Sequence, residues 1–198
     1  LLELIHEDIS GIKIGLQYIT QRSPDEIREL SKFKKPIFYD GKFFDIKNTL
    51  IESIKSLKDL NVDYATVHLL NGLDALNAAN QAAQKINLNL LGVSVLTSFG
   101  DEDLENLGFN DKVEDQVERL IKIAMEANLY GVVCSPLEIK MIKKIAPNLK
   151  CFTPGIRSAE KKNDQKRTMS ANEAIKEGSD YLIIGRPITK GNPKENIK

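Results

Sequence analysis

The feature that most constrains this fold is a regular alternation of short apolar runs with amphipathic helical segments. The runs are mostly continuous in apolar character, as expected of strands that are covered on both faces. They lie at residues 11–16, 36–40, 62–69, 90–97, 130–135, 149–153 and 180–185. Strands that alternate with helices in this way pair in parallel. The sequence therefore predicts an α/β fold built around a parallel sheet.

The helical segments carry the periodicity and the start signals of helices. Apolar residues three or four apart form one stripe at residues 50–57 and another at 113–124. Three starts carry a capping box, in which a serine precedes a glutamate by three residues: Ser23 with Glu26, Ser135 with Glu138, and Ser170 with Glu173. Pro24 and Pro136 take the first helical position, where proline is favoured. We expect a helix after every strand but the last, and a further helix before the first.

This pattern leaves two architectures open, a doubly wound sheet and a closed barrel. A (β/α)8 barrel needs eight strands, and only seven are predicted. The predicted helix at residues 1–8 should follow a strand of its own, which would lie upstream of Leu1. We favour the barrel: an α/β (β/α)8 TIM barrel whose first strand is missing from the N-terminus, with residues 1–198 forming a single domain.

Composition limits the classes of partner. Lys and Arg number 28, as do Asp and Glu, so the formal net charge is zero. This balance argues against a general nucleic-acid or anionic-membrane binder, and any anion site must be local. Cys134 and Cys151 lie in apolar runs without metal-ligand spacing, which is typical of reduced core cysteines in a cytoplasmic protein. No apolar run is long enough to span a membrane.

Charged residues follow the second predicted strand, and Lys13 lies in the first. Sites in parallel α/β folds gather at the C-terminal ends of strands. Asp40 and Lys42 are two residues apart, so in extended chain their side chains point the same way. If they face the barrel interior, they must pair with each other or with a ligand, because unpaired buried charges are unfavourable. The alternative is a solvated loop, with these charges and Asp45 facing water.

Two later strand ends pair a glycine with an arginine, Gly155 with Arg157 and Gly185 with Arg186. Loops after the last two strands of a barrel often bind phosphate. Glycine lets a backbone amide approach an anion, and arginine offers a fork of donors. The alternative is two ordinary turns with solvated arginines. The polar segment 158–168 between them is predicted to be a loop, either one that closes over a ligand or a plain surface loop.

Two further polar residues end predicted strands. His68 ends the third, and a lone histidine beside an apolar strand is more often structural than catalytic. Thr97 ends the fourth and is either a hydrogen-bonding group for a ligand or a helix cap. The aromatic residues are scattered and suggest no stacking platform for nucleic acid.

Together these motifs resemble the orotidine 5'-phosphate decarboxylase family. DGKFFDIKNT at residues 40–49 is similar to that family's Asp-x-Lys-x-x-Asp-Ile-Pro-Asn-Thr signature, with Lys47 for the proline and Gly41 for a bulkier residue. The family's His-x-x-Gly-Gly turn reads His68-Leu-Leu-Asn71-Gly72 here. Further matches follow in the family's order over nearly the whole chain, at residues 13–17, 93–98, 131–135, 153–157, 164–167 and 180–189.

The resemblance implies a homodimeric barrel, without cofactor or metal, that decarboxylates orotidine 5'-monophosphate. It implies that Lys42 protonates C6 of the pyrimidine as carbon dioxide leaves, that Asp40 lies beside the substrate carboxylate, and that Lys13 joins this charged network. Asp45 would reach across the dimer into the neighbouring site. The implied substrate-binding residues are Lys13, Thr49, Thr97, Pro154, Arg157, Gln165, Gly185 and Arg186. Thr49 would also cross the dimer, and Gln165 would contact both phosphate and base.

Other functions stay open. Keto-gulonate-phosphate decarboxylases and hexulose-phosphate synthases share the Asp-x-Lys-x-x-Asp strand end but use magnesium. Ile46, Asn48 and Thr49, with the TPGIR…DQ loop at residues 153–165, favour the orotidine enzyme over them. A non-catalytic nucleotide-binding barrel would bind without turnover. A doubly wound nucleotide-binding protein lacks support, because no glycine-rich fingerprint follows any strand.

Overall fold

The structure, a computed structural model, describes residues 1–157 and 167–197 and is built on one parallel sheet. Its seven strands are hydrogen-bonded in chain order, β1 to β7. They are β1 (Ile12–Gly15), β2 (Ile37–Phe43), β3 (Tyr64–His68), β4 (Asn89–Val93), β5 (Gly131–Val133), β6 (Lys150–Thr153) and β7 (Tyr181–Leu182). The sequential order rules out the doubly wound alternative, in which the strand order reverses at a switch point.

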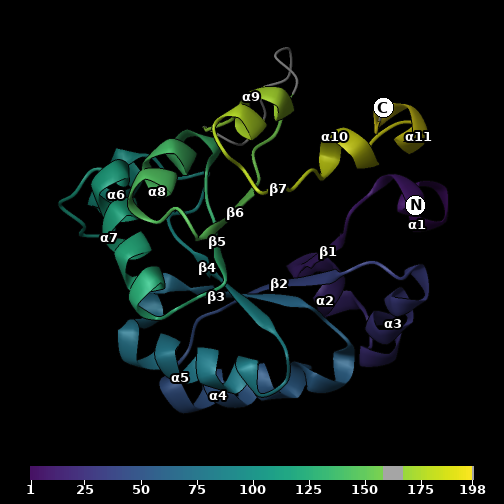
Figure 1. Ribbon diagram of the computed structural model, residues 1–198, viewed down its shortest axis with the longest axis horizontal. Coiled ribbons are helices and arrows are strands. Elements are labelled where there is room, and N and C mark those ends of the chain that lie inside the picture. Colours follow the sequence, from purple (N-terminus) through teal and green to yellow (C-terminus); the bar gives the residue numbers. More distant parts are fainter. Residues whose placement is uncertain (158–166, 198) are drawn as a thin grey trace.

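The sheet curls, and the helices lie on its outer side (Figure 1). β1 and β7 are its two edges, and no ladder joins them within the described residues. The N-terminal helix contacts the C-terminal helix beside these two edges (Figure 1). A curled parallel sheet with helices outside is the barrel architecture, so the predicted fold class is confirmed.

Helices lie before the first strand, in every interval between strands and after the last strand. They are α1 (Leu2–Ile5), α2 (Leu16–Gln21), α3 (Pro24–Arg28), α4 (Lys47–Ser56), α5 (Leu73–Gln84), α6 (Asp101–Asn106), α7 (Val113–Glu126), α8 (Ile139–Ile145), α9 (Ala171–Lys176), α10 (Arg186–Thr189) and α11 (Pro193–Asn196). Short 3₁₀ helices lie at His6–Asp8, Glu29–Phe33, Leu57–Leu60, Leu69–Asn71 and Pro136–Glu138.

The capping signals predicted from the sequence are confirmed, and one expectation is wrong. All three Ser–Glu boxes form, although the one at Ser135 caps a 3₁₀ turn that leads into α8. The last strand was expected to have no helix after it, but α10 and α11 follow β7. Both are single turns with proline near their start and no buried residue, so they carry no apolar period that a sequence could reveal.

The main core lies between the outer face of the sheet and the long helices. The stripes predicted at residues 50–57 and 113–124 form its helical side together with α5 and α8, and Leu50 and Ile121 are fully buried. Cys134 and Cys151 are buried there as free thiols, as predicted. A smaller core cluster is formed by other strand residues, Phe38, Leu91 and Phe152, and the two phenylalanine rings contact each other.

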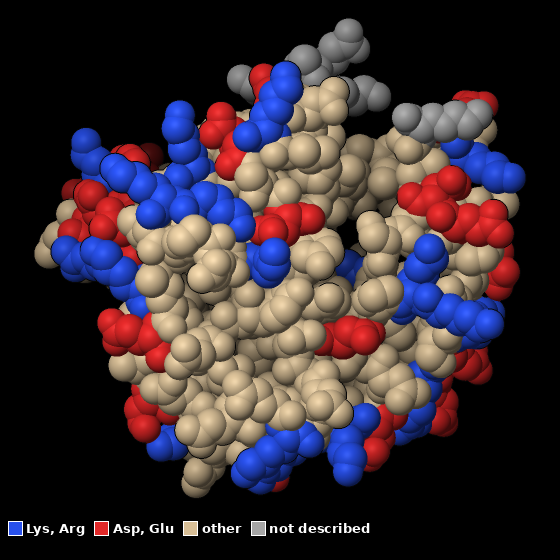
Figure 2. All heavy atoms as spheres, viewed as in Figure 1, with Lys and Arg blue, Asp and Glu red and all other residues tan. Residues whose placement is uncertain are grey.

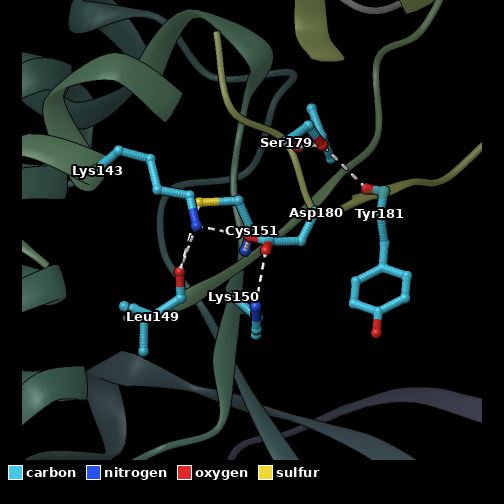
Figure 3. Close-up of polar contacts among 8 residues, drawn as sticks. Lys143, Leu149, Lys150, Cys151, Ser179, Asp180 and Tyr181 are labelled. Atoms are coloured by element: carbon cyan, nitrogen blue, oxygen red, sulfur yellow. Dashed lines mark hydrogen bonds and ion pairs between the residues drawn. The ribbon is translucent and has the colours of Figure 1, made fainter. Parts of the chain in front are cut away.

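Asp180 ties three elements together at the start of β6 and β7, the strand ends opposite the predicted site (Figure 3). Its carboxylate accepts hydrogen bonds from Lys143 Nζ of α8 at 2.6 Å, from Lys150 Nζ at 3.0 Å and from the Cys151 amide at 2.9 Å. Lys143 Nζ also donates to the Leu149 carbonyl at 2.9 Å. Burial opposes ionisation of Asp180, but these donors outweigh it and hold its pKa below the usual value.

The surface mixes both signs of charge. Figure 2 shows Lys and Arg side chains gathered most densely around α8, with Asp and Glu side chains among them. In the described part of the chain, no helix combines the length and apolar character needed to cross a membrane.

Candidate functional site

A cavity of about 330 Å³ lies where the strands end. Its walls come from the C-terminal ends of six strands or the loops that follow them. The lining residues are Lys13, Asp40, Lys42, Val93, Val95, Leu96, Thr97, Val133, Pro154, Gly155, Arg157, Ile183, Gly185 and Arg186. The structure thus brings most of the predicted site residues to one place, as the C-terminal edge of a parallel sheet should.

A larger groove of about 610 Å³ lies apart from these residues, between the turn Leu69–Asn71 and α7. Its two charged residues, Asp111 and Arg119, pair with each other at 2.9 Å. None of the predicted site residues that the structure describes lines this groove, so the strand-end cavity is the better candidate site.

Three charged side chains form the centre of the cavity. Asp40 Oδ2 accepts a hydrogen bond from Lys13 Nζ at 3.0 Å, and Asp40 Oδ1 accepts one from Lys42 Nζ at 2.8 Å. The Asp40 side chain is 11% exposed, whereas both lysines keep about a third of their surface open. Burial alone would raise the pKa of the Asp40 carboxyl, but Lys13 and Lys42 outweigh burial and lower it. Asp40 is therefore an ionised carboxylate between two ammonium groups.

The backbone that presents Lys42 is not extended. β2 pairs with β3 at Tyr39 and again at Phe43, but β3 advances by only two residues between these points, so β2 bulges. Lys42 lies in this bulge with φ of 50°, a left-handed conformation that L-residues rarely adopt. Bulges near sites often re-aim a side chain. The sequence predicted that Asp40 and Lys42 point the same way, because alternate residues of a strand do. Their side chains do meet, but they meet through this bulge and not along a regular strand.

Thr66 of β3 lies opposite the bulge and was not singled out from the sequence. Its Oγ1 accepts a hydrogen bond from the Lys42 amide at 2.8 Å and lies 3.2 Å from Asp40 Oδ1, to which it donates. Thr66 is fully buried. The available signal was its position two residues before His68, on a strand whose other central residues are apolar.

Gly41 separates two aromatic rings on the opposite side of β2. The rings of Tyr39 and Phe43 are nearly parallel, with centroids 5.8 Å apart. A Cβ at Gly41 would lie 2.8 Å from the Tyr39 ring, closer than real contacts allow. This departure from the family signature therefore has a local steric reason.

The phosphate-binding candidates also line the cavity. Arg157 is buried and Arg186 is exposed, and both contribute to the wall together with Thr97 and Pro154. Gly155 has φ of 82°, which explains the glycine in this turn. The remaining phosphate-binding candidate, Gln165, lies outside the described residues.

Asp45 and Thr49 are exposed and do not line the cavity of their own chain. The Asp45 amide donates to Asn71 Oδ1 at 3.2 Å, and Asp45 Oδ1 accepts from the Ile46 amide at 2.7 Å. Within the described residues, no hydrogen bond or ion pair joins Asp45 to Lys42. The family resemblance implies that both residues reach into a neighbouring site, and this stays a prediction.

His68 has the partners of a structural histidine. Its Nδ1 accepts a hydrogen bond from the Leu70 amide at 3.3 Å, and its ring lies 5.5 Å from the Phe44 ring. Burial and the charge of Lys42 both lower the pKa of the imidazole. A neutral ring with Nδ1 as acceptor carries its proton on Nε2.

Arg167 forms a second buried contact that the sequence did not reveal. Its guanidinium pairs with Glu138 and also donates to the carbonyls of Val95 at 3.2 Å and Leu96 at 3.0 Å, both in the cavity wall. Glu138 in turn accepts from the Ser135 amide at 2.9 Å. Burial raises the pKa of Glu138, although Arg167 opposes this. Glu138 of the capping box after β5 is thereby connected, through Arg167, to the part of the cavity wall that follows β4.

The arrangement suits chemistry that develops negative charge beside a fixed ammonium group. Lys42 can stabilise such charge and then supply a proton. Across residues 1–157 and 167–197, no three His, Cys, Asp or Glu side chains cluster closely enough to hold a metal ion.

Comparison with known proteins agrees with this geometry. The whole chain, residues 1–198, matches the "Orotidine 5'-phosphate decarboxylase / HUMPS family". It is 39% identical over 196 residues to the orotidine 5'-phosphate decarboxylase of Wolbachia pipientis subsp. Culex pipiens, covering 98% of this chain and 87% of that protein. It is 43% identical over 183 residues to the enzyme of that name from Dichelobacter nodosus, covering 90% and 80%.

A solved structure gives the same result for the fold. The crystal structure of orotidine 5'-phosphate decarboxylase from Lactobacillus acidophilus superposes with a TM-score of 0.82 at 31% identity, covering 93% of this chain and 82% of that one. With the charged strand end, the strand-end cavity and these relatives in agreement, this chain belongs to the orotidine 5'-phosphate decarboxylase / HUMPS family.

Proposed function

We propose that this protein is a carboxy-lyase that converts orotidine 5'-monophosphate to uridine 5'-monophosphate, the last step of de novo pyrimidine nucleotide synthesis. One observation carries the proposal: Lys42 Nζ lies 2.8 Å from a buried Asp40 carboxylate, in a cavity that also contains two arginines. The names of the relatives support the same reaction.

In this reaction, loss of carbon dioxide leaves an electron pair on C6 of the pyrimidine. The Lys42 ammonium stabilises that charge and donates its proton to C6. Asp40 lies beside the departing carboxylate, where repulsion disfavours the substrate more than the transition state. Lys13 neutralises the second oxygen of Asp40 and contacts the ribose. The hydrogen bonds that Asp40 accepts from the two lysines support this division of roles.

The phosphate lies at the opposite wall of the cavity in this proposal. Arg157, Arg186 and the Gly185 amide hold it, while Thr97 and Pro154 contact the base side. A further contact from Gln165 reaches both phosphate and base. Binding energy from a phosphate far from the reacting carbon can then be used to orient the pyrimidine. The placement of both arginines in one wall supports this assignment.

The active form is a cytoplasmic homodimer with one barrel domain per chain, residues 1–198, and it needs neither cofactor nor nucleic-acid or membrane partner. Asp45 and Thr49 complete the neighbouring site. Exposed apolar side chains around Asp45 support an interface there: Phe44 is 63% exposed and Ile46 is 74% exposed. Such side chains gain by burial against a second chain.

The test follows the loss of absorbance of orotidine 5'-monophosphate on addition of the purified protein, with and without EDTA. Lys42→Ala is the test variant. Lys55→Ala is the control, because Lys55 is exposed and pairs with Glu52 on the same helix. Turnover that survives EDTA, persists in Lys55→Ala and disappears in Lys42→Ala supports the proposal.

Other outcomes separate the alternatives. Turnover that EDTA abolishes and magnesium restores would favour a metal-dependent sugar-phosphate decarboxylase or aldolase, which the family description also covers. Binding of uridine 5'-monophosphate without turnover would indicate a non-catalytic nucleotide-binding barrel. Absence of both binding and turnover would overturn the assignment.

A further inference from the structure

We propose that Thr66 is a positioning residue whose hydroxyl sets the geometry of the Asp40–Lys42 pair. This inference rests on the proposed decarboxylation, in which that pair does the chemistry. Thr66 is not among the residues that line the cavity, and it acts through Asp40 and Lys42, which are.

The hydrogen bonds of Thr66 have only one possible direction. The Lys42 amide is a donor, so Thr66 Oγ1 must accept from it, at 2.8 Å. The single hydroxyl proton is then available to a second acceptor, and Asp40 Oδ1 lies 3.2 Å away. An ionised carboxylate can only accept. The Lys42 amide therefore donates to Thr66, and Thr66 donates to Asp40; neither hydrogen bond can run the other way.

The Thr66 hydroxyl takes the place of a backbone hydrogen-bond acceptor. Between Tyr39 and Phe43, β2 leaves its regular register with β3, so the Lys42 amide loses the backbone partner that a regular ladder would supply. A buried amide without an acceptor is strongly unfavourable. The Thr66 side chain supplies that acceptor and stabilises the left-handed backbone at Lys42, where φ is 50°.

Lys42 and Thr66 donate to the same oxygen of Asp40. Asp40 Oδ1 is the atom that accepts from Lys42 Nζ at 2.8 Å and also from Thr66. The hydroxyl thus limits rotation of the carboxylate and holds the lysine backbone at the same time. Thr66 is fully buried, so water does not compete for these bonds. A valine would fill the same space but make neither bond.

The test compares Thr66→Val, which keeps the shape, with Thr66→Ser, which keeps the hydroxyl. Asn80→Ala is the control for loss of buried hydrogen bonds, because Asn80 donates to the carbonyls of Ala127 and Asn128 far from the cavity lining. We expect Thr66→Val to lower kcat about 10- to 100-fold with KM changed less than about threefold, as misplacement of reacting groups does. Thr66→Ser should recover most of kcat, and Asn80→Ala should lower the melting temperature without this change in kcat.

A crystal structure of Thr66→Val tests the inference without reference to activity. We expect Lys42 to leave the left-handed region, or its ammonium to move away from Asp40 Oδ1. An unchanged pair geometry, or an unchanged kcat in an active wild-type background, would overturn the inference and leave the proposed function intact. If Thr66→Val does not fold, Thr66→Ala takes its place in both measurements. A wild-type protein without turnover would overturn the proposed function, and the geometry of the pair would still decide the role of Thr66.

Discussion

Asp40 and Lys42 lie two residues apart in sequence, and their carboxylate and ammonium groups meet at 2.8 Å across a left-handed turn of the backbone. The bulge that produces this turn is itself held by a hydrogen bond from the neighbouring strand. The charged pair is therefore a property of β2 and β3 together. Its geometry leads to predictions about catalysis, and the other buried ion pairs lead to predictions about stability.

Replacing Asp40 with asparagine keeps the shape of the side chain and removes its charge. Lys13 and Lys42 then lose their shared anionic partner, so the ammonium of Lys42 is no longer held in place. We expect kcat/KM for orotidine 5'-monophosphate to fall about 10²- to 10³-fold. Steady-state kinetics check this, with Asp25→Asn as the control because Asp25 is exposed and pairs within its own helix. A fall of less than about threefold would contradict the central role of Asp40.

Removing either cavity arginine should weaken binding of the phosphate. A charge-assisted hydrogen bond contributes about 1.5–3 kcal/mol, so Arg157→Ala and Arg186→Ala should each raise KM about 10- to 100-fold. The same variants should show little defect with orotidine, which lacks the phosphate. Arg119→Ala is the control, because Arg119 pairs with Asp111 outside this cavity. An equal defect with both substrates would place the phosphate elsewhere.

Asp180 should stabilise the fold in a way that depends on pH. Asp180→Asn removes the charge that three donors share, and we expect the free energy of unfolding at pH 7 to fall by about 1–3 kcal/mol. The pKa of Asp180 is lowered in the folded state. Its contribution is therefore fully present above the ordinary value of about 3.9 and is lost as pH falls through the lower folded pKa.

Urea unfolding of wild type and Asp180→Asn between pH 2 and pH 7 measures this dependence. The difference in free energy of unfolding between the two proteins should be constant near neutral pH and should become smaller at acid pH. Lys122→Ala provides a comparison, since its pair with Glu118 is an exposed contact on one helix and should contribute little. A difference that stays constant down to pH 2 would show that the charge of Asp180 is not what stabilises the protein.

Loss of the Arg167–Glu138 pair should change stability with pH in the opposite direction to loss of Asp180. Arg167→Leu leaves Glu138 buried without its cation, and breaking a buried pair in this way destabilises by about 3–5 kcal/mol at pH 7. Burial already raises the pKa of Glu138 in the folded state. A carboxyl with a raised folded pKa stabilises most below its unfolded pKa, and this contribution is lost as pH rises through the folded value. The Arg167→Leu protein should therefore regain stability as pH falls towards 4.

Replacing both partners separates the charge effect from loss of packing. In the double variant Arg167→Leu/Glu138→Leu, no unpaired charge remains, so stability at pH 7 should exceed that of Arg167→Leu alone. Thermal unfolding at pH 5 and pH 7 provides the measurement. If Arg167→Leu shows the same loss at both pH values, the ionised Glu138 carboxylate is not the source of the instability.

The sequence alone determined the order of the strands and of the helices between them, the three Ser–Glu capping boxes and the group of strand ends that form the cavity. These features are local or periodic: apolar runs, a serine three residues before a glutamate, and charged or glycine–arginine motifs directly after strands. Since parallel strands end at one edge of the sheet, Lys13, Asp40 and Arg186 had to come together once that order was fixed.

Only the tertiary structure decided how these residues are held. Thr66 contacts Lys42 across 24 residues of sequence, and Arg167 contacts Glu138 across 29. A threonine inside a strand carries no sign of an amide that has lost its ladder partner on the neighbouring strand, because the bulge exists only after β2 and β3 pair. The short helices α10 and α11 escaped prediction for a related reason: neither has a buried face from which a period could be read.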